Sequence, residues 1–526
     1  IKASLTINKI MSHKPHLLSP TTPLDEANRL MQRYGYEGYP VVDDGKVVGL
    51  LTRRAVDRAL QHKLKLNAGS LMEAGEHTVR STDPIEELQQ LMAATGWGQI
   101  PVIDPETDKI VGIVTRTDLL KSLPGQNGGK AGQQNYSGML EKALPAPRLA
   151  LLNLVADFAS SQKAAIYIVG GFVRDLLLDR PSLDFDFVVE GDALQFAHAL
   201  AQIHGGRVVS HKRFSTAKWM IKNIHKNLVP GVEGGQDTLL NLPDSLDFIS
   251  ARTEFYDHPT ALPTVERSSI KLDLHRRDFT INTLALRLDG QHYGELYDFW
   301  GGLQDLEKKL VRVLHSLSFV DDPTRLLRAV RFEQRFQFTI EKRTLQLMKE
   351  ARELLRQLSG ERIRHEFDLI FKEPDVFLIM RRLYELGLLA QIHPDLGWTI
   401  TDETAFKELD NYTQGVGWKL PRLVGNTPVR GVLVYLVWLS ALENEAGRQI
   451  SERLRLPRQV CDTLDKINHV LSSAGDFNRM RPSEFARALE KIPIYGVYAL
   501  FCRAGDENLK RKISNYAGKW RFITPG

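Results

Sequence analysis

The sequence predicts a multidomain protein with a small α/β repeat pair, an α+β head and an all-α C-terminal part. The chain has 526 residues, which is too long for one core at about 150 residues per domain. Two stretches near the N-terminus repeat each other. Strand-like and helix-like patterns then alternate until residue 315, beyond which apolar residues recur every three or four positions. These observations predict three architectures in one chain.

The composition is that of an ordinary globular protein, with 43% hydrophobic and 25% charged residues. No apolar run reaches about 18 residues, so we predict no membrane span, and the N-terminus has no signal-peptide pattern. The two cysteines, Cys461 and Cys502, exclude a disulfide framework and a cysteine-based zinc site, and they favour a cytoplasmic location. The net charge of +5 neither requires nor excludes nucleic acid.

The internal repeat consists of "GYPVVDDGKVVGLLTRRAVDRAL" (residues 38–60) and "QIPVIDPETDKIVGIVTRTDLLKSL" (residues 99–123). An amphipathic, helix-like stretch precedes each copy. A unit of this size buries its own faces poorly, so we expect the two units to pack together. The pattern resembles tandem CBS domains, to which we assign residues 1–123.

The resemblance to CBS domains implies an adenosine nucleotide as a ligand, held by a Gly-x-x-Thr-x-x-Asp pattern. The second unit has the whole pattern, with Thr115 and Asp118 as the ligand residues after Gly112. The first unit has Gly49 and Thr52, but Ala55 replaces the aspartate. At most one nucleotide site is therefore expected, and the alternative is a structural module or one that forms a homodimer.

Three further segments follow the repeats. The Gly- and Gln-rich stretch in residues 124–144 predicts a linker between two independent cores. Residues 145–314, where strands and helices alternate, predict a catalytic head. Residues 315–526 predict a helical neck, body and tail.

Two aspartates, Asp184 and Asp186, flank Phe185 in the strand-like run "LDFDFVVE". Residues i and i+2 of a strand point to the same face, so the two carboxylates aim together, with Phe185 buried behind them. Carboxylates this close repel each other unless a cation lies between them. Mg²⁺ prefers oxygen ligands of this kind.

The glycine pair Gly170-Gly171 lies between a predicted strand and a predicted helix. Backbone N–H groups there could approach a phosphate at a helix N-terminus, and Arg174, one turn further on, could reach it. An isolated Asp-x-Asp is usually a solvated turn or a cap. A phosphate cradle together with two carboxylates, however, is the arrangement of two-metal phosphoryl transfer.

These motifs resemble the signature of nucleotidyltransferases related to DNA polymerase β. The stretch "GGFVRDLLL" narrows the resemblance to the class II tRNA nucleotidyltransferase and bacterial poly(A) polymerase family. Further motifs follow in the family's order: "RFSTAKW", "LDFISARTEF", "HRRDFTINTLAL", "LYDFWGGLQDL", "DDPTRLLRAVRF" and "SGERIRHEF". The resemblance covers residues 145–395 and implies a polymerase-β-like head that uses Mg²⁺ at a two-metal site.

The resemblance also implies residue roles. Asp184 and Asp186 would hold the metals, and Asp247, in the apolar run "LDFIS", would be a third catalytic carboxylate; otherwise Asp247 is a charge at a strand end. The residues implied in nucleotide binding are Gly170, Gly171, Arg174, Arg276, Arg277, Asp278 and Asn282. Asp278 could equally be a helix N-cap, since aspartate is a favoured cap.

The motif "DDPTRLLRAVRF" resembles the helix that selects the incoming base. Asp322 and Arg325 lie three residues apart, which puts them on one helical face, and they would hydrogen-bond to the base edge. The alternative is a surface ion pair. Arg328 and Arg331 continue the stripe and would face phosphate. Asp321 replaces the glutamate common in the family.

The helical tail contains basic stretches such as "LKRKISNYAGKWR". Basic side chains neutralise phosphates without selecting a sequence, which suits tRNA; the alternative is ordinary solvated helix faces. The resemblance thus predicts addition of the terminal A, or of CCA, to tRNA 3′ ends from ATP, or from ATP and CTP. Alternatives are poly(A) synthesis and an inactive nucleotide-sensing RNA-binding protein. Because the chain begins at Ile1, we expect a longer parent protein, and a DHH-type phosphoesterase domain often precedes this arrangement.

Overall fold

The computed structural model describes residues 6–13, 15–34, 38–62, 64–95, 97–115, 118–119, 134–180, 185–211, 215–228, 242–255, 264–410 and 418–523. The chain divides into two compact units. The first comprises Ile1–Asp321 and Thr339–Leu347, and the second comprises Asp322–Phe338 and Met348–Gly526. The units therefore divide at Asp321, a few residues after the boundary that the sequence predicts. Across the ranges described, no helix has the length and apolar character needed to cross a membrane.

Each repeat contains an antiparallel hairpin preceded by a helix, as predicted. The first has α1 (Leu24–Tyr34), β2 (Gly38–Asp43), β3 (Lys46–Thr52), α2 (Arg53–Gln61) and α3 (Ala68–Leu71); the second has α4 (Ile85–Thr95), β6 (Gln99–Ile103) and β7 (Ile110–Thr115). The short strands between and before them are β1 (Ser12–His13), β4 (Glu73–Ala74) and β5 (Val79–Arg80).

The two repeats exchange short strands. β1, which precedes α1 of the first repeat, pairs with β7 of the second. β4, which precedes α4 of the second repeat, pairs with β3 of the first. Each exchanged strand brings a methionine against a hairpin glycine: a Cβ would lie 2.6 Å from Met72 Sδ at Gly49, and 2.7 Å from Met11 Sδ at Gly112. Neither repeat completes its sheet alone, which explains why the two pack together.

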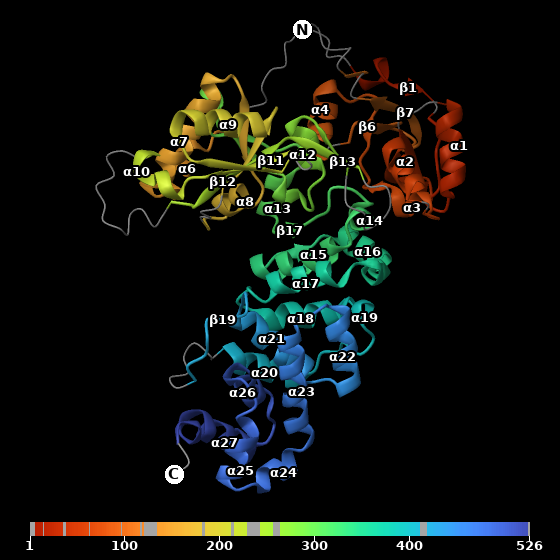
Figure 1. Cartoon of the computed structure of the whole chain (residues 1–526). Helices are drawn as coiled ribbons and strands as arrows, with labels where there is room; N and C mark the ends of the chain where they lie inside the picture. Colours follow the sequence, from red (N-terminus) through yellow and green to blue (C-terminus); the bar gives the residue numbers. More distant parts are fainter. Residues whose placement is uncertain are drawn as a thin grey trace. The chain divides into compact units, whose positions relative to one another are not determined.

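The head is a seven-stranded sheet of order β10-β11-β12-β9-β8-β15-β16. Its strands are β8 (Ala165–Val169), β9 (Asp186–Glu190), β10 (Arg207–His211), β11 (Thr216–Met220), β12 (Ser245–Ser250), β15 (Ala285–Arg287) and β16 (Glu295–Tyr297). β9 and β12 run parallel, and the other adjacent strands are antiparallel. Helix α9 (Ala193–His204) packs against β11 and β12 (Figure 1).

Further elements complete the first unit. They are α6 (Ser137–Ala143), α7 (Ala146–Ser161), α8 (Gly171–Leu177), α10 (His225–Leu228), α12 (Ile270–His275), α13 (Gly302–Glu307), α14 (Ser318–Asp321) and the strand pairs β13 (Arg252–Phe255) with β14 (Thr264–Arg267) and β17 (Leu310–Val311) with β18 (Thr339–Ile340).

Two expectations about the connection between repeats and head need correction. Residues 134–144 of the predicted linker belong to the head: Tyr136 N donates to Gly294 O at 2.7 Å, and Leu140 of α6 is fully buried. The core of the first repeat is also not independent of the rest of the chain, because it includes Leu317, which follows the head. Local composition identified a polar segment but carried no information about these long-range contacts.

The second unit is almost entirely helical (Figure 1). Its helices are α15 (Thr324–Phe336), α17 (Gly360–Ile370), α18 (Val376–Glu385), α19 (Leu389–Ile392), α20 (Ile400–Asp410), α21 (Val429–Leu439), α22 (Asn444–Arg453), α23 (Arg458–Ser472), α24 (Ala474–Arg479), α25 (Pro482–Leu489), α26 (Ile494–Arg503) and α27 (Glu507–Gly518). The strands β19 (Leu423–Val424) and β20 (Thr427–Pro428) form a short hairpin, and α16 (Lys342–Ala351) begins in the first unit and ends in the second.

Candidate functional site: carboxylates and arginines of the head

The parallel pairing of β9 with β12 brings two predicted catalytic carboxylates side by side. Asp186 is the register partner of Asp247, so the two side chains share a face of the sheet. On the opposite face, Phe187 stacks on Phe248 at 5.2 Å between ring centroids, and Phe196 of α9 packs on Phe248. The buried aromatic face therefore fixes the register that directs the aspartates outward.

A lysine extends this row of side chains onto the third strand. Lys218 of β11 is the register partner of Asp247, and its Nζ lies 3.4 Å from Asp247 Oδ2. The Asp247 side chain is 46% exposed and Asp186 is also exposed, so solvent and solutes reach the row. We call Lys218, Asp247 and Asp186 the carboxylate row.

The partner carboxylate proposed from the sequence, Asp184, lies outside the described residues. Phe185 is 6% exposed, in agreement with the prediction that it packs behind the aspartates. The strand itself begins at Asp186. Within the described ranges, no three His, Cys, Asp or Glu side chains gather closely enough to hold a metal ion. The donors that the structure describes at this edge are therefore Asp186 and Asp247.

The glycine turn lies at the end of β8. Gly170 has φ +70°, in the left-handed region, and its N–H donates to Leu284 O at 3.0 Å. A Cβ on Gly170 would lie 2.8 Å from Arg277 Nη1, whereas one on Gly171 would meet only Arg174 Nη2, at 3.6 Å. Gly170 thus provides the space in which the Arg277 guanidinium lies.

Arg174 is buried next to this turn and forms a network of polar contacts there. Its guanidinium lies 2.7 Å from Asp175 Oδ1 and donates to Asn282 Oδ1 at 2.6 Å. Asn282 in turn donates from Nδ2 to Asp278 Oδ1 at 2.8 Å. Asp278 is not an N-cap, because Phe279 occupies that position before the 3₁₀ turn at Thr280–Asn282. Three of the predicted nucleotide-binding residues, Arg174, Asn282 and Asp278, are therefore linked by hydrogen bonds.

Asp273, which the sequence analysis did not select, orients both arginines of the motif "HRRDF". Its carboxylate is fully buried; Arg276 Nη2 donates to Oδ1 at 2.8 Å and Arg277 Nη2 to Oδ2 at 3.3 Å. Burial alone would raise the pKa of Asp273, but the guanidinium groups of Arg277 and Arg276 and the hydrogen bonds outweigh it and lower the pKa. The spacing of Asp273 three and four residues before the arginines on α12 was the available signal.

The predicted base-selecting residues belong to the second unit. Asp322 precedes α15 instead of lying on it, which corrects the expected shared helical face. Its Oδ1 accepts from Thr324 N at 3.0 Å and Oγ1 at 2.7 Å, and from Arg362 Nη2 at 2.7 Å. Arg325 N donates to Asp322 O at 3.1 Å, so both residues lie in one turn. Arg362 was missed because nothing local links it to Asp322.

The two arginines further along α15 contact acidic residues of the same unit. Arg328 Nη1 lies 3.9 Å and Arg331 Nη1 3.8 Å from Glu366, and Arg331 Nε lies 3.9 Å from Glu373. The Arg331 side chain is only 8% exposed. This guanidinium therefore lies among carboxylates of its own unit, and its predicted contact with phosphate stays a prediction.

The pattern in the second repeat also has a structural explanation. Asp118 Oδ2 accepts from Thr115 N at 3.0 Å and Oγ1 at 2.7 Å, and Asp118 N donates to Thr115 Oγ1 at 3.1 Å. This reciprocal bonding has the form of a capping box. Together with the close contact of Met11 on Gly112, it accounts for all three residues of the pattern without a ligand.

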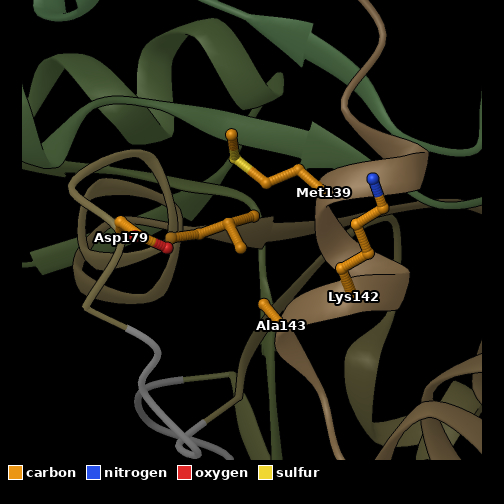
Figure 2. Close-up of a pocket in the computed structure, with 5 residues that line it drawn as sticks. Met139, Lys142, Ala143 and Asp179 are labelled. Carbon is orange, nitrogen blue, oxygen red and sulfur yellow. The ribbon is translucent and has the colours of Figure 1, made fainter.

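A small cavity lies between α6 and the end of α8. Its volume is about 330 Å³, and Met139, Lys142, Ala143, Leu176 and Asp179 line it. Figure 2 shows Met139 and Lys142 on one helix and Asp179 beside the neighbouring one. None of these residues belongs to the carboxylate row or the glycine turn, so the cavity is separate from the candidate site.

A polymerase-type sheet with paired carboxylates beside a glycine turn is the architecture of a nucleotidyltransferase. Residues 166–312 match the family described as "Poly A polymerase head domain", and residues 337–398 match "Probable RNA and SrmB- binding site of polymerase A". Residues 7–62 and 68–125 each match the CBS domain, which confirms the interpretation of the repeat.

Named relatives agree with these matches. The chain is 35% identical to the A-adding tRNA nucleotidyltransferase of Geobacter sulfurreducens, over 98% of this chain and 59% of the relative. It is 30% identical to the A-adding tRNA nucleotidyltransferase of Aquifex aeolicus, over 99% of this chain and 60% of the relative. The chain thus spans about three fifths of the length of these curated relatives.

Solved structures show the same similarity. A CCA-adding enzyme in complex with ATP superposes with a TM-score of 0.59 at 30% identity, covering 74% of this chain and 85% of that one. The chain therefore belongs to the tRNA nucleotidyltransferase family that includes the CCA-adding enzymes. This membership confirms the resemblance inferred from the motifs.

We predict that Asp273→Asn destabilises the protein by about 3–5 kcal/mol at pH 7, because two partly buried guanidinium groups lose the buried anion that they share. The pKa of Asp273 is lowered by folding, so its contribution is fully present above the unfolded value of about 3.9 and is lost as the pH falls through the folded value. The difference in urea midpoint between wild type and variant should therefore shrink below about pH 4. Asp244→Asn, at an exposed surface pair, is the control. Equal midpoints at pH 7 would contradict the role assigned to Asp273.

Proposed function

We propose that this chain carries the catalytic and tRNA-binding parts of an A-adding tRNA nucleotidyltransferase. In this reaction the 3′-hydroxyl of a tRNA ending in CC attacks the α-phosphate of ATP, AMP is added and pyrophosphate leaves. The observation that carries the proposal is the carboxylate row beside the glycine turn, in a head of this family. The choice of A over CCA is supported by the two relatives that match nearly the whole chain, repeats included.

We propose that Asp184, Asp186 and Asp247 hold Mg²⁺ at a two-metal site. The described residues fit the ion, because Asp186 and Asp247 are adjacent oxygen donors open to solvent and need a cation to offset their repulsion. Lys218 supplies part of that positive charge at one end of the row. Bound Mg²⁺ would supply stabilisation of the negative charge that develops on the phosphate oxygens.

The glycine turn and the arginines are proposed to hold the triphosphate. Gly170 and Gly171 have no side chains, so a phosphate could approach the backbone of the turn beside the guanidinium of Arg277. Arg276 and Arg277 each donate to Asp273, and their side chains are 17% and 19% exposed. A guanidinium held by its own buried anion keeps its direction while it binds phosphate, so little reorganisation is needed. Arg174, Asn282 and Asp278 support the turn from below.

Base choice is proposed to depend on Asp322 and Arg325. A carboxylate accepts and a guanidinium donates hydrogen bonds, as the edge of adenine requires. Arg362 and Thr324 hold Asp322, so the acceptor has a fixed direction. The basic stretches of the tail would then bind tRNA phosphates. The location proposed for the enzyme is the cytoplasm. An adenosine nucleotide at Thr115 and Asp118, and a homodimer formed through the repeats, stay predictions.

Three tRNAs test the function: one without the CCA end, one ending in CC and one with the complete CCA. Each is incubated with the protein and labelled ATP or CTP. Addition of a single A to the CC-ending tRNA alone supports the proposal. Growth of all three CCA positions would identify a CCA-adding enzyme, long A tracts a poly(A) polymerase, and tRNA binding without addition an inactive RNA-binding protein.

Asp186→Ala and Asp184→Ala should each lower the rate of A addition by about 10²–10³-fold or more, because the site loses a carboxylate that offsets cation charge. Binding of tRNA, measured by filter retention, should stay near wild type, since the tail supplies those contacts. Asp244→Asn, near β12 but paired with exposed Lys222, should leave both properties unchanged. Wild-type turnover in either variant would rule out the carboxylate role.

Gly170→Ala should lower kcat/KM for ATP by about 10²-fold, because the new Cβ displaces Arg277 and the positive φ strains the turn. The matched change Gly171→Ala meets only Arg174, at an ordinary contact distance, and should have a much smaller effect. Steady-state kinetics on the CC-ending tRNA compare them. Equal losses in both variants would count against the role of Arg277.

Asp322→Ala and Arg325→Ala should reduce the preference for ATP over CTP by about 10–100-fold, the effect of losing a charged hydrogen bond. The KM for the triphosphate should change less, because the phosphate contacts belong to the head. Single-nucleotide addition with each substrate measures both quantities. Arg335→Ala, at an exposed position of the same helix, is the control. Unchanged discrimination in both variants would exclude the proposed base contacts.

A further inference from the structure

Helix α2 of the first repeat contacts the segment that leads into the base-selecting turn. Arg58 Nη1 lies 3.2 Å from Asp321 Oδ2 and 3.2 Å from a ring nitrogen of His315. His62 Nε2 lies 3.5 Å from Asp321 Oδ1. The side chains of Asp321 and His62 are 7% and 1% exposed, so this is a buried ionic contact and not a surface ion pair.

Apolar and backbone contacts fix the same segment to the first repeat. Leu317, 3% exposed, is part of the repeat's core, and Val320 packs against that core. Ser316 Oγ donates to Met72 O at 2.6 Å. Residues 315–321 are therefore seated in the repeat, and burial of Leu317 makes the contact persistent.

The buried carboxylate of Asp321 is paired with the guanidinium of Arg58. Its Oδ2 accepts from Arg58, while Oδ1, although buried, accepts no hydrogen bond in the part of the chain that the structure describes. A buried carboxylate that loses its guanidinium must move toward water, because an unpaired buried charge is costly. Because Asp322 is the next residue in the chain, movement of Asp321 would also displace the backbone of Asp322.

The residue types that make this contact are not repeated in the second unit. At the positions that correspond to Arg58 and His62, the second repeat has Lys121 and Gly125. The first repeat also has Ala55 where the second has Asp118. The helix that lacks the aspartate of the Gly-x-x-Thr-x-x-Asp pattern is thus the one that carries the residues contacting Asp321.

We propose that Arg58 is a positioning residue for base selection: it holds Asp321, and through it the next residue, Asp322, which lies just before α15. The inference rests on the proposed function, because it requires that Asp322 takes part in the choice of base. It gives the first CBS repeat a direct part in the accuracy of nucleotide addition, independent of any ligand bound to the repeats.

The test uses the full chain and a tRNA ending in CC, with kcat and KM measured separately for ATP and CTP. Arg58→Ala should lower the ATP preference at least about fivefold, and Arg58→Lys should recover part of it. Asp321→Asn, which keeps the shape of the side chain and is a milder change, should act in the same direction. Its effect should not add fully to that of Arg58→Ala, because both disturb one contact. Arg53→Ala, in an exposed pair on the same helix, is the matched control.

The outcomes separate the two proposals. A wild-type chain that adds no nucleotide overturns the proposed function and this inference with it. An active wild type whose ATP preference is retained in Arg58→Ala and Asp321→Asn overturns the inference alone. A lower kcat for both nucleotides at an unchanged preference indicates a structural role only and also overturns it. Loss of preference in Arg58→Ala and Asp321→Asn, with the Arg53→Ala control unchanged, supports it.

Discussion

The parallel pairing of β9 with β12 is the constraint on which the candidate site depends. Residues 186 and 247 are far apart in sequence, and only this pairing makes their carboxylates neighbours. Neighbouring carboxylates repel, so the sheet must be held in register by something stronger. The stacked rings of Phe187 and Phe248 under α9 provide it, because a slip by one residue would expose them and bury the aspartates.

The arginines of the head pose the opposite problem, since several guanidinium groups lie near one another. Each lies beside a carboxylate of the head: Arg276 and Arg277 share Asp273, and Arg174 pairs with Asp175. In the carboxylate row, Lys218 Nζ lies 3.4 Å from Asp247 Oδ2, on the strand next to β12.

Patterns within short segments of the sequence predicted the features that are set by neighbouring residues in the chain. The repeat, the buried Phe185, the strand around Asp247 and the glycine turn all follow from periodicity or from residue type. Asp273, Lys218 and Arg362 were missed, although each holds a predicted residue. Lys218 pairs with Asp247 on another strand, and Arg362 pairs with Asp322, 40 residues earlier. Such long-range pairs cannot be predicted from the sequence of one segment. Asp273 was close enough in sequence to be found, but a buried aspartate is indistinguishable there from a solvated one.

The two repeats share some residues and differ at others, and the structure gives a reason for each case. Gly49 and Gly112 are shared because each hairpin receives a methionine from an exchanged strand, and a Cβ would block it. Other positions differ between the repeats: Asp118 closes a local cap, whereas Arg58 of the first repeat contacts Asp321. The stability of the pair and its link to the rest of the chain thus depend on different residues. A change at Arg58 can therefore act on the segment before α15 without dismantling the repeats that carry it.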